Sequence, residues 1–403
     1  MTATRILRVA TLAVGGVIWA LAAAVLWRTR VPDDLQLPSL NEKSIFGSDL
    51  VDQAERYERF FNVSWVLGTV AGLAALAWMV RRGPRVARSL RLGPVNAGII
   101  LGAVTLTVVW AVSLPFGLAT EWWQRRHGIS TESYGSALAL AWGGLLTTIL
   151  VGFVVLAGLL LLAKKVGAWW WLAAAPLLVA LFTALQLAIP YVLSIDTHPL
   201  RDPELVAQIR QLERREGAGD PPVREERVSD RTTAANAYSV GIGPSERVIF
   251  WDTLLDGRFG DREVRFVAAH ELAHLARNHI SKSVGWFTLF IVPILGAAAF
   301  LTERRGGLRN PGTVPLALLA IVAVQLAALP LRNAITRRYE AEADWVALTA
   351  TRDPGAARGL FRLFAHTSLQ DPSPPWWAHV LLDDHPSALE RIEQAAAWKA
   401  RNP

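Results

Sequence analysis

The chain has 403 residues, of which 52% are hydrophobic and 19% are charged. It contains no cysteine, which excludes disulfides, thiolate metal ligands and a cysteine nucleophile. The net charge of +7 could suit a nucleic-acid-binding protein, but no nucleic-acid module is present. The basic residues gather instead in short connectors, where they favour contact with anionic lipid headgroups; one such group is Arg81, Arg82, Arg85, Arg88 and Arg91.

Seven apolar stretches each approach or exceed the roughly twenty residues that a helix needs to cross a hydrocarbon core. They lie at 9–27, 61–80, 95–119, 136–163, 166–193, 283–301 and 313–331. A buried soluble helix could explain any one of them, but not all seven. The sequence therefore predicts a mainly α, polytopic protein of the cell membrane. The first stretch has no convincing cleavage site, so we expect an uncleaved helix there.

Two polar blocks interrupt the apolar pattern, and together they predict one soluble domain. They divide the chain into a five-helix region (1–193), a first catalytic part (194–282), a membrane hairpin (283–331) and a second catalytic part (332–403). In the first block, 202–215 predicts a surface helix with Leu205, Ile209 and Leu212 on one side. A charged linker is expected at 216–231, and a β-hairpin at 234–242 and 247–251 around the turn at 243–245.

The segment His270-Glu271-Leu272-Ala273-His274 carries the most informative motif. It lies in a run from 263 to 280 without Gly or Pro, after a loop that ends in a candidate N-cap at Asp261. Residues four apart on a helix share a face, so His270 and His274 can both reach one zinc ion. Glu271 can then reach a water on the open side of the metal as a general base. The alternative is an amphipathic helix with His and Glu on its solvated face.

A catalytic zinc usually takes three protein ligands, so a third is needed. Glu340 and Asp344 are four apart and share a helix face. One carboxylate could bind the metal while the other holds a ligand His by its free ring N–H. Spacing alone does not choose between Glu340 and Glu342, and an ordinary charged helix face explains the pattern too.

Both motifs, and the membrane hairpin between them, resemble the integral-membrane zinc metalloproteases of the type I CAAX prenyl endopeptidase family. More weakly matching segments are Leu114-Pro115-Phe116, Arg126-His127-Gly128, Asn236-Ala237-Tyr238 and His385-Pro386. The resemblance covers nearly the whole chain, and the Ala- and Arg-rich composition suggests a bacterial member. It implies seven helices ringed around a chamber, a small α+β metalloprotease domain, and one Zn²⁺ per chain held by His270, His274 and Glu340.

The resemblance also assigns supporting roles. It implies that Asp344 and Arg391 lie behind the metal ligands, that Glu342 is not a ligand, and that His385 donates a hydrogen bond to the developing oxyanion. Residues Asn236, Ala237 and Tyr238 would form a strand edge along which a substrate peptide lies extended. From the residues alone, these three are a plain edge strand and His385 is a polar turn. His279, His366 and His379 receive no role.

The expected function is a membrane-embedded, zinc-dependent endopeptidase, in which a water activated by zinc attacks the peptide carbonyl. The partners implied are membrane lipids and a peptide or membrane-protein substrate, with prenylated C-termini as one class, and the protein is expected to be a monomer. The alternative is a seven-helix transporter or receptor with a structural metal site, which would need a fourth ligand and no base.

The distribution of basic residues leaves the sidedness open. Lys164, Lys165, Arg304, Arg305 and Arg309 would place their connectors in the cytoplasm and the catalytic blocks outside. The opposite side is basic too. Family precedent puts the catalytic domain on the cytoplasmic face, and we expect the same orientation for this protein.

Overall fold

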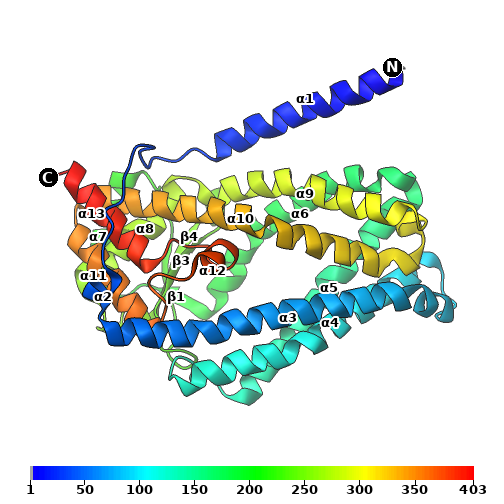
Figure 1. Ribbon diagram of the computed structural model, residues 1–403. Helices are drawn as coiled ribbons and strands as arrows, with labels where there is room; N and C mark the ends of the chain where they lie inside the picture. The colour runs from blue at the N-terminus through cyan, green and yellow to red at the C-terminus, as the bar shows by residue number, and fades with distance from the viewer. Residues whose placement is uncertain (1–2) are drawn as a thin grey trace.

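The computed structural model describes residues 3–403, with side chains from residue 14 onward, and is dominated by long helices that run side by side (Figure 1). These are α1 (Ala3–Leu26), α3 (Ser48–Ser89), α4 (Pro94–Arg126), α5 (Tyr134–Val166), α6 (Trp170–Leu193), α9 (His279–Glu303) and α10 (Val314–Thr351). In the order α3, α4, α5, α6, α9, α10 each helix contacts the next, and α10 returns to contact α3. These six helices therefore form a closed ring. Helix α1 packs on α9 from outside it.

Five helical stretches in the described chain are long and apolar enough to cross a membrane. They are Ser48–Ser89, Pro94–Arg126, Tyr134–Asp196, His279–Glu303 and Pro311–Thr351. The third, of 63 residues, contains α5 and α6 and therefore two of the predicted spans. The span predicted at 9–27 falls in α1. Among the residues whose side chains are described, this helix has a shorter apolar stretch, Val14–Leu26. The protein is thus a multi-pass membrane protein, while the number of seven crossings stays a prediction.

The remaining elements gather at the end of the ring where the C-terminus lies (Figure 1). The helices are α2 (Glu42–Phe46), α7 (Pro203–Glu216), α8 (Asp261–Ala276), α11 (Pro354–Ser368), α12 (Trp376–Leu381) and α13 (Ala388–Arg401). The strands are β1 (Thr197–Pro199), β2 (Val223–Glu226), β3 (Ala237–Val240) and β4 (Arg247–Trp251). They form one sheet in the order β1-β2-β4-β3. Strands β2 and β4 are parallel and the other pairs antiparallel, and β3 is an edge strand.

Three local expectations can be compared with this part of the chain. The amphipathic helix is confirmed as α7, with Leu205, Ile209 and Leu212 buried, and the hairpin is confirmed as β3 and β4. The expectation of a linker throughout 216–231 was wrong, because β2 forms there by pairing with β1 and β4. The helix expected over 263–280 ends at Ala276, since Asn278 adopts a left-handed φ of 56°. Gly260, not Asp261, occupies the N-cap position.

A compact apolar core lies beneath α8. Phe250 from β4 and Phe266 and Leu272 from α8 are fully buried, together with Phe361 from α11 and Ile392 from α13. Burying each side chain of this size contributes roughly 1.5–3 kcal/mol. Leu272 lies on the face of α8 opposite His270 and His274, and Phe266 lies one turn before His270, so packing holds the backbone that carries the two histidines rigidly.

Candidate metal centre and active site

Helices α8 and α10 bring three potential metal ligands together. His270 and His274 project from α8, and Glu340 projects from the part of α10 that lies beyond the bundle; one ligand atom from each falls within 4.8 Å of the others. The two Nε2 atoms are 3.1 Å apart. Glu340 Oε2 is 3.2 Å from His270 Nε2, and Glu340 Oε1 is 3.5 Å from His274 Nε2. This is the set that the sequence motifs brought forward.

Hydrogen bonds behind His270 fix the orientation of its ring. Its Nδ1 lies 2.9 Å from Asp344 Oδ1, so Nδ1–H donates to the carboxylate and the Nε2 lone pair faces His274 and Glu340. Arg391 holds Asp344 in turn through a two-pronged ion pair, with both nitrogen–oxygen distances 2.7 Å. Such a partner orients a metal-binding imidazole and increases its basicity.

A second chain of hydrogen bonds lies behind His274, and it was not expected from the sequence. His274 Nδ1 is 3.0 Å from His279 Nδ1, and His279 Nε2 is 3.0 Å from Glu342 Oε2. Because the carboxylate accepts the proton on His279 Nε2, His279 Nδ1 accepts from His274 Nδ1–H. Glu342 also accepts from Arg277 Nε at 2.9 Å. His279 and Glu342 therefore orient His274 as Asp344 orients His270.

These two chains leave the Nε2 lone pairs of His270 and His274 facing each other at 3.1 Å. The same space contains Glu340 Oε2, which is buried and has no hydrogen-bond partner in the described part of the chain. Two facing lone pairs and an orphaned carboxylate oxygen are unfavourable unless a cation lies between them. The donor set of two imidazoles and one carboxylate thus fits a metal ion.

The charge state of His270 points in the same direction. Burial lowers the pKa of its imidazole, but the hydrogen bond to Asp344 and the nearby Glu340 carboxylate outweigh burial and raise the pKa to about 10. The surrounding carboxylates therefore stabilise a positive charge at this position. A metal cation would supply that charge in place of the proton.

A cavity of about 360 Å³ opens beside the three ligands. Its lining includes the buried Glu271 and also His385 and Arg391, while Asn236, Ala237 and Tyr238 line it from β3. Strand β3 packs beside α8. One edge of β3 pairs with β4, and the opposite edge has no strand partner within the sheet. The remaining residue singled out in the sequence, Asp344, lies behind His270.

His385 lies in the loop between α12 and α13, with its side chain half exposed. Its Nδ1–H donates to Asp384 at 2.7 Å, and its Nε2 is 3.3 Å from Glu340 Oε2. Partial burial lowers the pKa of this imidazole, but the hydrogen bond to Asp384 and the nearby Glu340 charge raise it above its usual value overall. The ring is thus favoured as a hydrogen-bond donor into the cavity.

Comparison with known proteins identifies the group to which this arrangement belongs. The sequence model of peptidase family M48 matches residues 199–399. This range includes β2, β3, β4, α8, the ligand-bearing half of α10 and the loop with His385. The chain belongs to peptidase family M48. Membership of this family makes it a metalloprotease.

Several known proteins are similar to parts or most of this chain. The chain is 30% identical over 210 residues to the uncharacterized metalloprotease YhfN of Bacillus subtilis (strain 168), and the alignment covers 50% of this chain and about half (49%) of that relative. It is 22% identical to a CAAX prenyl protease 1 homolog of Oryza sativa subsp. japonica, over 80% of both chains. It is 29% identical to a protease HtpX homolog of Acaryochloris marina (strain MBIC 11017), over 49% of this chain and 72% of the relative.

The fold agrees with that of a solved structure. The crystal structure of S. mikatae Ste24p superposes with a TM-score of 0.72, covering 94% of this chain and 96% of that one, at 16% sequence identity. At this identity the similarity concerns the fold alone. The arrangement of this M48 chain, a helical ring with a small mixed sheet at one end, is therefore that of the Ste24p fold.

Proposed function

We propose that this protein is a membrane-embedded zinc endopeptidase with one Zn²⁺ per chain, held by His270, His274 and Glu340. The observation that carries the proposal is the convergence of two imidazole lone pairs and an unpaired carboxylate oxygen beside a cavity that also contains Glu271. Two His and one Glu form a ligand set typical of catalytic zinc. When bound, zinc acts as a Lewis acid towards a water molecule and a peptide carbonyl.

The protein's own residues would divide the remaining work. Glu271 is proposed to accept a proton from the attacking water and to deliver it to the leaving amine. The free edge of β3, at Asn236, Ala237 and Tyr238, would hold the substrate backbone extended by strand addition. A transporter or receptor with a structural metal, the alternative reading, would leave Glu271 without a role.

The direct test is cleavage of a quenched fluorescent peptide by protein reconstituted in lipid nanodiscs. We expect hydrolysis that is lost after dialysis against a chelator and restored by about one equivalent of Zn²⁺ per chain. Metal content is measured in parallel. Activity that persists in metal-free protein would contradict the proposal, as would protein that binds zinc stoichiometrically but cleaves neither soluble nor membrane-bound peptides.

His385 is proposed to donate a hydrogen bond to the oxyanion that develops on the substrate carbonyl, acting mainly in the transition state. We expect His385→Ala to lower kcat by roughly a hundredfold or more, with little change in KM or in metal content. Steady-state kinetics and metal analysis of this variant separate three roles. Loss of metal would make His385 a ligand, and an unchanged kcat with full metal content would remove it from the mechanism.

Two cavities support the further proposal that the ring of helices encloses a chamber. One of about 770 Å³ is lined mainly by α3, α4 and α10, and one of about 670 Å³ mainly by α5, α6, α9 and α10. Arg332 lines both, and the second reaches His274 and Glu340. Its largely apolar wall would suit a lipid-modified or membrane-derived peptide. Prenylated C-termini, which the name of the rice relative suggests, are one such class.

Whether prenylation is required can be measured by comparing otherwise identical peptides with and without the lipid; equal kcat/KM values would argue against such a requirement. We also propose that the protein is a monomer and that its catalytic end faces the cytoplasm. Reporter fusions to the connector at 81–91 and to the C-terminus test the orientation. The mass of the solubilised protein tests the oligomeric state.

A further inference from the structure

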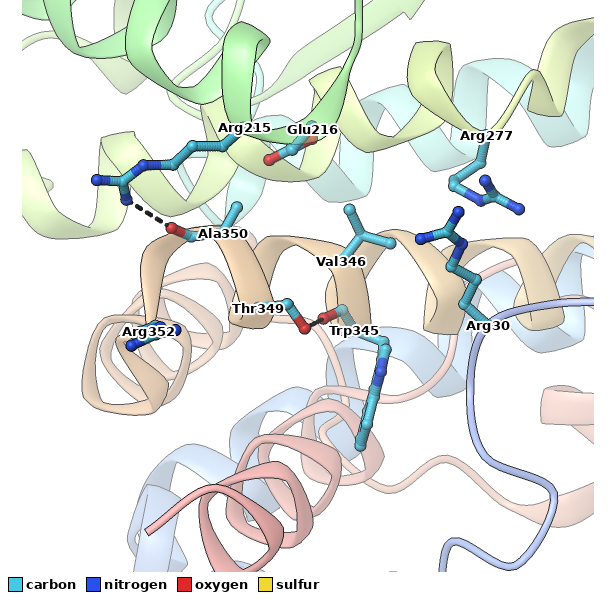
Figure 2. A pocket seen from close by; sticks show the side chains of 9 residues that line it. All are labelled: Arg30, Arg215, Glu216, Arg277, Trp345, Val346, Thr349, Ala350 and Arg352. Carbon is cyan, nitrogen blue, oxygen red and sulfur yellow. Dashed lines mark hydrogen bonds between the residues drawn. The ribbon is translucent and has the colours of Figure 1, made fainter.

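A second polar cavity, of about 590 Å³, lies outside the proposed catalytic site (Figure 2). It lies between the end of α7, the end of α8, the last turns of α10 and the connector after α1. It shares no lining residue with the cavity that contains Glu271. Its volume falls within the range typical of small-ligand sites.

Four arginines line this cavity: Arg30, Arg215, Arg277 and Arg352. Figure 2 shows the guanidinium groups of Arg30 and Arg277 turned towards each other at one end, with Arg215 at the other. Like charges in one cavity repel unless a counter-charge lies between them. A counter-charge is therefore needed to neutralise the four guanidinium groups.

The protein supplies little of that counter-charge. Arg277 is paired with Glu342, and Arg215 donates only to the uncharged carbonyl of Ala350, at 2.9 Å. Among residues 14–403, whose side chains the structure describes, no hydrogen bond or ion pair involves the guanidinium groups of Arg30 and Arg352, and both side chains are exposed. Two fully unpaired guanidiniums and a third bonded to a neutral group form an excess of positive charge and of unused N–H donors.

The one carboxyl in the cavity, Glu216, does not offset this excess. Both its oxygens are buried without a hydrogen-bond partner in the described chain, and burial raises its pKa to about 9. The group is therefore uncharged at neutral pH. In that state its hydroxyl can donate a hydrogen bond to an anion instead of repelling it.

The position of two arginines relates the cavity to the membrane surface. Arg30 lies four residues after α1 ends at Leu26, and Arg277 lies two residues before α9 begins at His279. Both helices carry apolar stretches. Arginines just outside such stretches lie at the level of lipid headgroups.

We propose that this cavity binds one phosphate-bearing anion, held between Arg30 and Arg277 at one end and Arg215 and Arg352 at the other. The planar guanidinium fork matches phosphate oxygens in pairs, which explains a site built from arginine and not lysine. The anion is the headgroup of an acidic phospholipid or a small free phosphate compound. Arg277 also pairs with Glu342 behind His274, but anion binding is measured without turnover, so failure of this proposal is distinguishable from failure of the proposed peptidase activity.

The test uses the double variant Arg30→Gln/Arg352→Asn in the full-length protein. Asn is chosen at 352 because the backbone there has a φ of 54°, which Asn tolerates. Arg277 is kept because it holds Glu342. The matched control is Arg358→Gln/Arg362→Gln, which removes the same charge from two exposed residues of α11. Delipidated protein is titrated with phosphatidylglycerol or phosphatidylcholine by native mass spectrometry, and with pyrophosphate by equilibrium dialysis.

We expect one phosphatidylglycerol or one pyrophosphate to bind the wild type and the control, and at least tenfold weaker binding by the double variant. Phosphatidylglycerol binding alone identifies a lipid headgroup, and pyrophosphate binding alone a free phosphate compound. The proposal is overturned if neither binds, if phosphatidylcholine binds equally well, or if the control loses as much affinity. Should the double variant not fold, Arg30→Gln alone must weaken binding at least threefold; an unchanged affinity overturns the proposal.

Discussion

We expect Glu271→Gln protein to lose peptide hydrolysis by roughly 10²–10⁴-fold, the usual contribution of a positioned general acid–base group, while it keeps its zinc. The amide retains the shape of the carboxylate but cannot accept a proton from water. Glu271 is buried in the wall of the cavity beside His270 and His274 and is not one of the three clustered ligands. The metal site should therefore remain intact.

The measurement is kcat on a fluorogenic peptide, with the zinc content of the same preparation determined by atomic absorption. A suitable control is Glu263→Gln, which makes the same chemical change in the first turn of α8. Zinc-loaded Glu271→Gln protein that retains substantial activity would exclude Glu271 as the base. Loss of zinc from this variant would instead assign the residue to the metal site.

The second large effect is expected from Glu340→Ala, which should lose zinc and activity together because only two protein ligands remain. The neighbouring Glu342 provides a sharp comparison. Its carboxylate faces His279 and Arg277, not the space between the two ligand imidazoles. Glu342→Gln should therefore weaken zinc binding by roughly 10–100-fold, as is typical for residues that orient a ligand, without removing the site.

Zinc affinity is measured by competition with a chromophoric chelator, and the fold is checked by far-UV circular dichroism. Retention of zinc by Glu340→Ala with complete loss from Glu342→Gln would show that the third ligand was placed on the wrong face of α10. Equal affinities for Glu342→Gln and wild type would show that the His279–Glu342 chain does not support His274.

Those parts of the fold that depend on local sequence could be predicted. The length of the apolar stretches identified the membrane helices, and the helical spacing of Leu205, Ile209 and Leu212 predicted the buried face of α7. Strand β2 was missed because its sequence, Val-Arg-Glu-Glu, is short and polar; it becomes a strand only through pairing with two segments distant from it along the chain. The end of α8 was missed because no Gly or Pro marks it, and Asn278 adopts the left-handed conformation instead.

The candidate site shows a similar division. Spacing placed His270 and His274 on one face and offered Glu340, Glu342 and Asp344 as carboxylates, and the resemblance chose among them. His279 could not be related to His274 from the sequence, because the two are not three or four residues apart and the break at Asn278 turns the chain between them. The structure supplies what the spacing lacked: Glu342 is fully buried, and a buried carboxylate needs a partner. The anion cavity left no motif at all, because its four arginines come from separate segments.

The division of the ligands between α8 and α10 has a consequence for the synthesis of the protein. Residue 340 leaves the ribosome 66 residues after His274, roughly 3–13 s later at ordinary elongation rates. The helices that lie between them, α9 and the first part of α10, must enter the bilayer before Glu340 can reach the two histidines. A nascent chain that has not completed this insertion holds two ligands only. With the proposed ligands, the order of synthesis would delay completion of the metal site until these helices are in the membrane.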